Sequence, residues 1–328
     1  MVLLYLSMHS SFLFKGRMNK MMKEGLPLKA KTSKKAKSRE AITFYLLISP
    51  WLIGFLWFVI GPMVISFWVS LHHWDLLSDP IWIGFDNYVR AFTNDPLFFQ
   101  ALRVTFTFAF VSVPLGLVVS LMVASLLNQI KKGLRVFRTI YYIPVVVSGV
   151  AVMVLWMFIF NPQVGLLNQF LALFGIEGPG WIFDDRWALP SLIIMSLWNI
   201  GGTIIIWLAG LMGVSESLYE AADLDGANRF QKFRYVTLPS ISPTIFFNLI
   251  MGIIGALQAF GQAFVMTGGG PRNSTLLFNF YLWRHAFSDF RMGYASALAW
   301  VLFVIIMIFT LITFKSSAFW VHYESERK

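Results

Sequence analysis

Residues 220–239 read EAADLDGANRFQKFRYVTLP, and they separate two long apolar segments of a 328-residue chain. The stretch holds three acidic and three basic residues, although only 13% of the chain is charged. A charged island between apolar segments predicts an exposed connection with local structure of its own.

Capping chemistry predicts a short helix at the start of this connection. Ser217 and Glu220 have the spacing of a capping box, in which each side chain bonds an orphan amide of the other residue. The first helix is therefore expected to begin there and to run to about Leu224. Gly226 follows its end, where a left-handed conformation suits glycine.

A second short helix is expected over residues 229–235. Asn228 is a favourable N-cap for it, and Pro239 is expected to end it. The sequence thus predicts a helix–turn–helix at the surface. Three interpretations are open for this stretch: a catalytic site, an ordinary amphipathic loop, and a rigid peg that contacts a partner protein.

The rest of the chain has the composition of a membrane protein. Hydrophobic residues make up 57% of the sequence, and about 20 consecutive apolar residues suffice for a helix to cross the hydrocarbon core. Six segments contain no Asp, Glu, Lys or Arg: residues 41–71, 104–127, 139–160, 188–214, 240–266 and 292–314. These segments predict an all-α integral membrane protein with six transmembrane helices, and the charged stretch lies between the fourth and the fifth.

Basic residues predict the orientation of the chain. Ten of the 26 Lys and Arg residues precede residue 41, so residues 1–40 are expected to form a disordered cytoplasmic tail ahead of a transmembrane domain over 41–328. Most of the others fall in segments on the same side as this tail, which places both termini and residues 220–239 in the cytoplasm. The +10 net charge is therefore attributed to membrane orientation, with no nucleic-acid partner.

Three segments are expected on the outer side. Residues 81–102 mix aromatic and polar residues and suit a helix that lies in the membrane interface. The loops 161–187 and 267–291 are long enough to be functional. Either loop could dock an external partner or act only as a lid.

Several kinds of chemistry are excluded by the sequence. The chain has no cysteine, it lacks a G-x-x-x-x-G-K-[ST] phosphate loop, and none of the six segments carries an ionisable relay of the kind that proton-coupled carriers use. His72 and His73 stand beside Trp74 at an expected membrane interface and are not expected to bind a metal. We therefore predict no catalytic residue, no metal site and no cofactor bound by this chain.

The charged stretch also resembles a known motif. Glu220, Ala221, Ala222 and Gly226, followed by the Leu238-Pro239 pair, match the EAA loop of ABC-importer permeases. The family has Ile where Val236 stands. The segments GFDNYVRAF (84–92), TGGGPRNST (267–275) and MGYASALAW (292–300) further resemble the carbohydrate-uptake, maltose-transporter type, and the resemblance begins near residue 43.

This resemblance implies a permease subunit in a bacterial cytoplasmic membrane, which works with several partners. They are a second homologous permease, two cytoplasmic ATPase subunits that bind ATP and Mg, and an extracytoplasmic solute-binding protein. The EAA loop is then a coupling helix that docks on an ATPase and catalyses nothing. The residues expected to take part in coupling are Glu220, Ala221, Ala222, Asp225, Gly226, Arg229, Phe230, Phe233 and Pro239.

Uncharged polar and small residues beside aromatic residues mark the expected path of the substrate. They follow each other in the fourth segment (Ser196, Trp198, Asn199, Gly201, Gly202 and Thr203) and in the fifth (Asn248, Gly252, Gly255, Gln258 and Gln262). Such residues commonly serve helix packing, but amides beside aromatic rings also suit a sugar or oligosaccharide. The residues expected to line the path are Ser148, Trp198, Asn199, Thr203, Gly255 and Gln258. The alternatives are an ABC permease for another solute, neutral or anionic, and a secondary transporter or channel.

Overall fold

The computed structural model describes residues 34–130 and 133–322, and most of these residues are helical. The predicted helical fold class is confirmed. Within the described residues the strands are limited to β1 (His72–His73) and β2 (Ile81–Trp82), which pair antiparallel with His72 opposite Trp82. The predicted tail over residues 1–40 lies mostly outside the described residues.

The chain divides into two units, Met1–Met63 and Val64–Lys328. The first contains α2 (Lys34–Phe55), η1 (Leu56–Ile60) and the start of α3 (Gly61–Ser70). The continuous helix over Ile42–Ser70 is long and apolar enough to cross a membrane. Large apolar side chains such as Trp57 and Phe58 are exposed along it. Exposed apolar side chains on a long helix suit a lipid environment.

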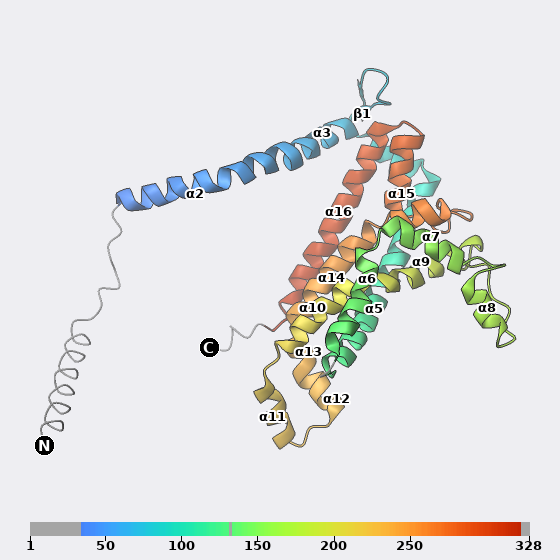
Figure 1. Ribbon diagram of the computed structural model, residues 1–328. Coiled ribbons are helices and arrows are strands. Elements are labelled where there is room, and N and C mark those ends of the chain that lie inside the picture. The colour runs from blue at the N-terminus through green and yellow to red at the C-terminus, as the bar shows by residue number, and fades with distance from the viewer. Residues whose placement is uncertain (1–33, 131–132, 323–328) are drawn as a thin grey trace, which may run out of the picture. The chain divides into compact units, whose positions relative to one another are not determined.

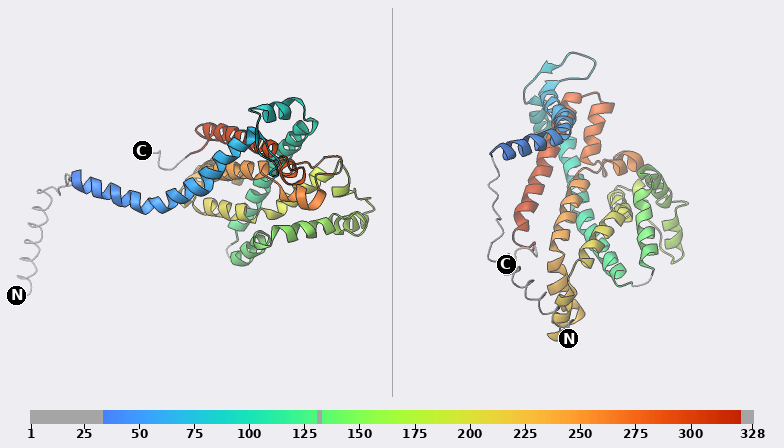
Figure 2. Two further views of the ribbon diagram at one scale, coloured as in Figure 1. Left: turned by 90° about the horizontal axis from the view of Figure 1, so that it is seen from above. Right: turned by 60° about the vertical axis from the view of Figure 1, so that its left-hand side comes forward.

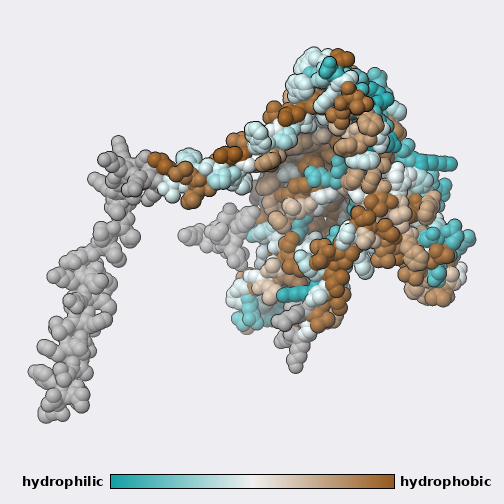
Figure 3. Space-filling model, turned by 45° about the horizontal axis from the view of Figure 1, so that its top comes forward, coloured by the Kyte–Doolittle hydropathy of each residue, from teal (hydrophilic) through white to brown (hydrophobic). Residues whose placement is uncertain are grey.

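The second unit is built around four helices that pack side by side (Figures 1 and 2). They are α5 (Pro96–Asn128), α10 (Gly201–Met212), α14 (Ser242–Leu257) and α16 (Met292–Ser317). Among the described residues of this unit, α5 and α16 are the helices long and apolar enough to cross a membrane without a break. Brown, apolar residues cover much of the face shown in Figure 3.

The other three predicted spans are bent, where the sequence analysis treated each as one continuous segment. The α6 (Leu134–Val146) and α7 (Gly149–Ile159) helices meet at 96°, and α9 (Ala188–Ser196) with η3 (Leu197–Asn199) meets α10 at 50°. The described residues therefore hold three continuous candidate spans, or up to six if each bent pair is one span. Hydropathy alone contains no signal for such bends.

The third bend interrupts the predicted span 240–266. The helix over Arg229–Ser240 meets α14 at 68°, and Pro243 stands in the first turn of α14, where its missing N–H costs nothing. The α14 helix ends at Leu257, and helical structure resumes at Gly261 and continues through η5 (Ala263–Thr267). Gln258 therefore caps α14 rather than standing within a continuous helix.

The predicted interface helix over 81–102 is also divided. Residues 81–82 form β2, α4 covers Asp86–Thr93, and Asp95 begins a new helix as the N-cap of α5. Its side chain accepts a hydrogen bond from the Leu97 amide at 3.0 Å, and Pro96 occupies the first helical position. This cap and proline combination starts a helix, so one helix cannot run through it.

Shorter helices connect these elements. They are α8 (Leu166–Ala172), η2 (Trp181–Phe183), α11 (Glu216–Leu224), α12 (Arg229–Lys232), η4 (Phe233–Thr237), α13 (Leu238–Ser240), α15 (Phe278–Trp283) and η6 (Arg284–Ser288). In Figure 1, α11 and α12 lie at one end of the helices of the second unit, and α15 lies at the other.

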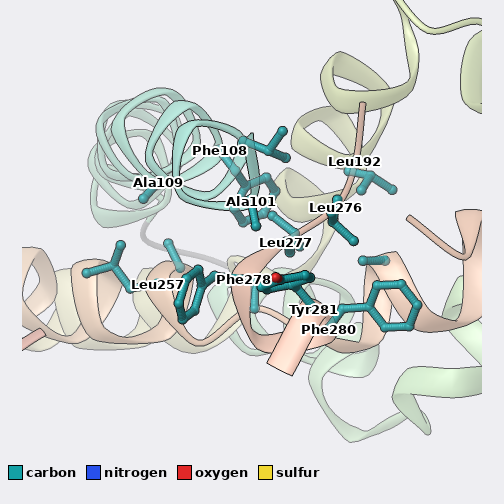
Figure 4. Packing of buried hydrophobic residues seen from close by; sticks show 14 of the residues in the cluster. Ala101, Phe108, Ala109, Leu192, Leu257, Leu276, Leu277, Phe278, Phe280 and Tyr281 are labelled. Carbon is teal, nitrogen blue, oxygen red and sulfur yellow. The ribbon is translucent and has the colours of Figure 1, made fainter. Parts of the chain in front are cut away.

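The main hydrophobic cluster of the second unit gathers near the α15 end. Leu276, Leu277 and Phe278 are fully buried, and they pack toward Ala101 and Phe108 of α5 (Figure 4). Thr105 extends this contact, because its hydroxyl accepts a hydrogen bond from the Phe278 amide at 2.7 Å. These contacts thus fix the segment before α15 to α5.

Candidate functional site

A cavity of about 640 Å³ lies between α5, α6–α7, α9–α10 and α14. The described residues that line it include no Asp, Glu, Lys, Arg or His. Its polar lining residues are Ser112, Ser196, Asn199, Thr203, Asn248 and Gln262, and the remaining ones are apolar or glycine. A space of this size with a few polar groups among apolar walls has the character of a binding site for a small molecule.

Three of the predicted path residues line this cavity. Asn199 ends the short η3 helix, Thr203 stands in the first turn of α10, and Gly255 lies near the end of α14. Helices that are distant in sequence therefore bring these residues to one space.

The other three predicted path residues are not among the lining residues. Ser148 is the N-cap of α7, between the lining residues Val147 and Gly149. Trp198 is 49% exposed and meets Trp156 edge to face at 6.1 Å between ring centroids. The Gln258 carbonyl accepts a hydrogen bond from Asn279 Nδ2 at 2.9 Å. Because α14 ends at Leu257, a helical spacing from Gly255 does not carry on to Gln258.

Four further polar residues line the cavity but were not among the selected path residues: Ser112, Ser196, Asn248 and Gln262. The last three had been noted as polar positions in the fourth and fifth segments, whereas Ser112 had not been noted. Ser112 lies on α5 and is buried. The sequence analysis did not identify a polar face in the segment that contains it. Asn248 on α14 is 5% exposed, and its Nδ2 has no hydrogen-bond partner among the described residues. A buried amide donor without a partner is costly, so Asn248 is well placed to donate to a molecule in the cavity. The only signal in the sequence was an amide within an uncharged segment.

The predicted helix–turn–helix is present as α11 and α12. Gly226 has φ +73°, as predicted for the turn. The Asn228 cap of α12 is confirmed too, since Asn228 Oδ1 accepts from the Gln231 amide at 2.9 Å and Gln231 Oε1 accepts from the Asn228 amide at 2.7 Å. These contacts fix the turn locally.

The predicted capping box at the start of the first helix is wrong. The α11 helix has Ser215 as its N-cap, so Ser217 already lies within the first turn. The Ser217 hydroxyl lies 2.8 Å from the Ser215 hydroxyl and caps no amide of α11. The connection from α10 is short enough that α11 starts two residues earlier than predicted.

The expected end of the second helix is also corrected. The chain continues through the π-helical turn η4 and through Pro239 to Ser240, and the break comes at Ile241. Pro239 is tolerated because it stands in the first turn of α13.

The predicted coupling residues differ in exposure. Glu220, Ala221, Asp225, Arg229 and Phe230 are exposed, whereas Ala222, Phe233 and Pro239 are half-buried. Leu224 is 91% exposed and Phe230 is 73% exposed. The apolar residues at the tip of this hairpin are thus Leu224 and Phe230, while Phe233 faces partly inward.

A second polar cluster lies at the α15 end. Both Tyr281 and Tyr294 donate hydrogen bonds to Asp95 Oδ2, the latter at 2.5 Å. Burial raises the pKa of Asp95, but these two hydrogen bonds and the Leu97 amide outweigh it and hold the pKa below its usual value. Burial also raises the pKa of Tyr281, so its hydroxyl stays protonated and donates.

His285 completes this cluster. Its ring packs edge to face on Tyr281 and Tyr294, with centroids 4.6 Å and 5.1 Å away, and its Nδ1 lies 2.7 Å from Asp289 Oδ2. Burial lowers the pKa of His285 more than Asp289 raises it. The described residues hold no group of three or more His, Cys, Asp or Glu residues that could bind a metal ion.

Helices long and apolar enough to cross a membrane surround a cavity that has a few polar groups and, among its described lining residues, no charged one, and this arrangement is suited to a membrane permease. The sequence matches the family described as "Binding-protein-dependent transport system inner membrane component" over residues 112–322. The chain belongs to this family, and its predicted resemblance to ABC-importer permeases is confirmed.

Individual relatives agree with the family match. The chain is 43% identical to the probable ABC transporter permease YesP of Bacillus subtilis, over 91% of this chain and 98% of that one. It is 34% identical to the trehalose/maltose transport system permease MalF of Thermococcus litoralis, over 87% and 97%. A solved bacterial alginate ABC transporter, in complex with an alginate pentasaccharide-bound periplasmic protein, matches with a TM-score of 0.73 at 25% identity, over 88% of this chain and 97% of that one.

Proposed function

We propose that this chain forms half of the translocation path of an ABC importer for a sugar or oligosaccharide. The observation that carries the proposal is the cavity lined by Asn199, Thr203 and Asn248, with no Asp, Glu, Lys, Arg or His among its described lining residues. Amide and hydroxyl groups form hydrogen bonds with sugar hydroxyls, and the apolar walls suit the faces of sugar rings. The names of the relatives, which include trehalose, maltose and alginate transport, support the same substrate class.

The α11–α12 hairpin is the proposed contact with a separate ATPase. Its motif residue Gly226 forms the turn, and its exposed tip offers Leu224, Arg229 and Phe230. A compact, exposed hairpin with two large apolar side chains is suited to a groove on a partner. ATP and Mg belong to that partner, and this chain binds neither and catalyses no reaction.

The proposed assembly contains this permease, a second homologous permease, two cytoplasmic ATPases and an external solute-binding protein. The six predicted segments cross the bacterial cytoplasmic membrane, with three of them bent, and both termini face the cytoplasm. The α11–α12 end is then cytoplasmic, and the α15 end with its long loops faces the binding protein. The distribution of basic residues supports this orientation.

The test is purification of the tagged chain from native membranes, followed by identification of every subunit that accompanies it. The expected result is an ATPase, a second permease and uptake into proteoliposomes that requires ATP and the accompanying binding protein. A chain that purifies alone and moves solute without ATP would overturn the proposal in favour of a secondary transporter.

A further inference from the structure

The α11 helix is poorly anchored by apolar contacts. It has nine residues, none of which is buried. Isolated helices of this length are marginal in water, and no hydrophobic cluster in the described residues includes α11. Its position relative to α12 and η4 therefore depends on a few specific contacts.

Two side-chain contacts join α11 to the segment after the turn. The hydroxyls of Tyr219 and Thr237 lie 2.9 Å apart, and Thr237 is buried within η4. Nearer the turn, Lys232 Nζ forms an ion pair with Asp223 Oδ1. The Lys232 side chain is 22% exposed and the Asp223 side chain is 64% exposed, so the pair lies at the surface.

The two contacts are nested around the turn at Gly226. Tyr219 and Asp223 are four residues apart, so they share one face of α11. Their partners lie on the returning segment in reverse order. The contacts therefore act as two successive cross-links between antiparallel segments, which we call the hairpin clamp.

The clamped hairpin leads directly to the cavity. The helix over Arg229–Ser240 meets α14 at 68°, and α14 contributes Asn248, Gly252 and Gly255 to the cavity lining. A displacement applied at the tip of the hairpin reaches α14 only if α11 and α12–η4 move together. If α11 can move independently of α12–η4, the displacement is not passed on to α14.

We propose that Tyr219 and Lys232 are positioning residues for coupling, because they lock α11 to α12–η4 and make the hairpin one rigid lever. This inference rests on the proposed coupling function. The inference gives a role to Tyr219 and Lys232, which are not part of the EAA motif. Exposed ion pairs and single hydrogen bonds add little to global stability, so the clamp is expected to affect transmission more than assembly.

A cysteine reporter in the cavity can measure this transmission without knowledge of the cargo. The chain has no native cysteine, and a side chain at Gly255 meets no atom within 4 Å. The complex carrying Gly255→Cys is purified from native membranes and placed in proteoliposomes. A membrane-impermeant maleimide is added outside, and its labelling rate is measured with and without ATP and vanadate.

With the native hairpin, ATP and vanadate are expected to change the labelling rate of Gly255→Cys. Tyr219→Phe, Thr237→Val, Asp223→Lys and Lys232→Asp are each expected to reduce this change about fivefold, the equilibrium factor of one net hydrogen bond. The double charge reversal Asp223→Lys/Lys232→Asp restores the change. The double variant Tyr219→Phe/Thr237→Val is no worse than either single variant.

Tyr235→Phe is the matched control, since Tyr235 is 73% exposed on the same hairpin and takes no part in the clamp. The amount of co-purified ATPase is measured in every sample and is expected to be equal. If the native hairpin responds to ATP and every clamp variant responds equally, the clamp has no coupling role. If the labelling rate with the native hairpin does not change with ATP and vanadate, or if no ATPase co-purifies, the proposed coupling function is wrong. The clamp then has no coupling role either.

Discussion

The carboxylate of Asp95 accepts a hydrogen bond from the hydroxyl of Tyr294 at 2.5 Å, although 199 residues separate the two in sequence. The same carboxylate caps α5 and accepts from Tyr281 of α15. One side chain thus joins the first turns of α5 and α16 to α15. Charge-assisted hydrogen bonds are about twice as strong as neutral ones, so this node is expected to hold the α15 end of the second unit together.

Removal of this carboxylate is expected to destabilise the protein. Asp95→Ala loses the helix cap and leaves two buried tyrosine hydroxyls without an acceptor, which together should cost about 2–3 kcal/mol. The measurement is thermal unfolding in detergent, followed by tryptophan fluorescence. Asp86→Ala on the neighbouring α4 is the control. Equal Tm values for the two variants would contradict the role of the node.

The buried histidine predicts that mild acid lowers stability. Burial holds the folded-state pKa of His285 below its ordinary value of 6.5, so the unfolded chain binds more protons than the folded one as pH falls through 6.5. Stability from this group is full above 6.5 and is lost toward the lowered pKa. The Tm should therefore fall between pH 7.5 and 5.5, and less so in His285→Gln. Parallel pH profiles of the two proteins would contradict this prediction.

Local chemistry was predictable from the sequence and long-range geometry was not. Gly226 and Asn228 act through neighbours a few residues away, and both were placed correctly. Ser217 was misplaced as a cap because α11 already begins after Ser215, whose backbone is extended and whose hydroxyl caps no amide of the helix. The Asp95 node joins residues nearly 200 positions apart, and no periodicity in one sequence signals such a contact.

The candidate cavity was predicted in part for the same reason. Asn199, Thr203 and Gly255 follow from polar residues in otherwise apolar segments. Gln258 was included because a continuous helix was assumed, whereas α14 ends one residue before it. Ser112 was missed because a single serine in an apolar helix is most often only a packing residue.

The left-handed turn at Gly226 is expected to be essential for coupling. Gly226→Val forces a β-branched residue to φ +73°, which costs roughly 1–2 kcal/mol or more and distorts the hairpin. ATP hydrolysis by the assembled complex should continue while ATP-driven uptake falls at least about tenfold. Gly226→Asn is the control, because asparagine tolerates this conformation. Full uptake by the valine variant would contradict the requirement.

The unpartnered amide in the cavity is expected to contribute to cargo binding. Asn248→Leu removes the free Nδ2 donor and should lower uptake about fivefold, the factor of one net hydrogen bond. The cargo is the sugar bound by the co-purified binding protein, whose own affinity stays unchanged. Gln258→Leu is the control, because that side chain does not line the cavity. A larger loss for Gln258→Leu than for Asn248→Leu would reverse the assignment.

Two adjacent glycines allow a sharp test of how α10 packs on α6. A Cβ at Gly201 would lie 2.0 Å from the Tyr141 carbonyl oxygen and 3.1 Å from Val145 Cγ2, whereas a Cβ at Gly202 meets nothing within 4 Å. Gly201→Ala must therefore push α10 away from α6, which should cost about 1–3 kcal/mol and widen the cavity that both helices line. Gly202→Ala should be neutral or slightly stabilising, since alanine favours helix by up to about 1 kcal/mol. Thermal unfolding of the two purified variants measures the difference. Equal Tm values would mean that the backbone of α6 moves away from the added Cβ at no cost in stability. The close approach at Gly201 would then not determine the position of α10 relative to α6 at the cavity.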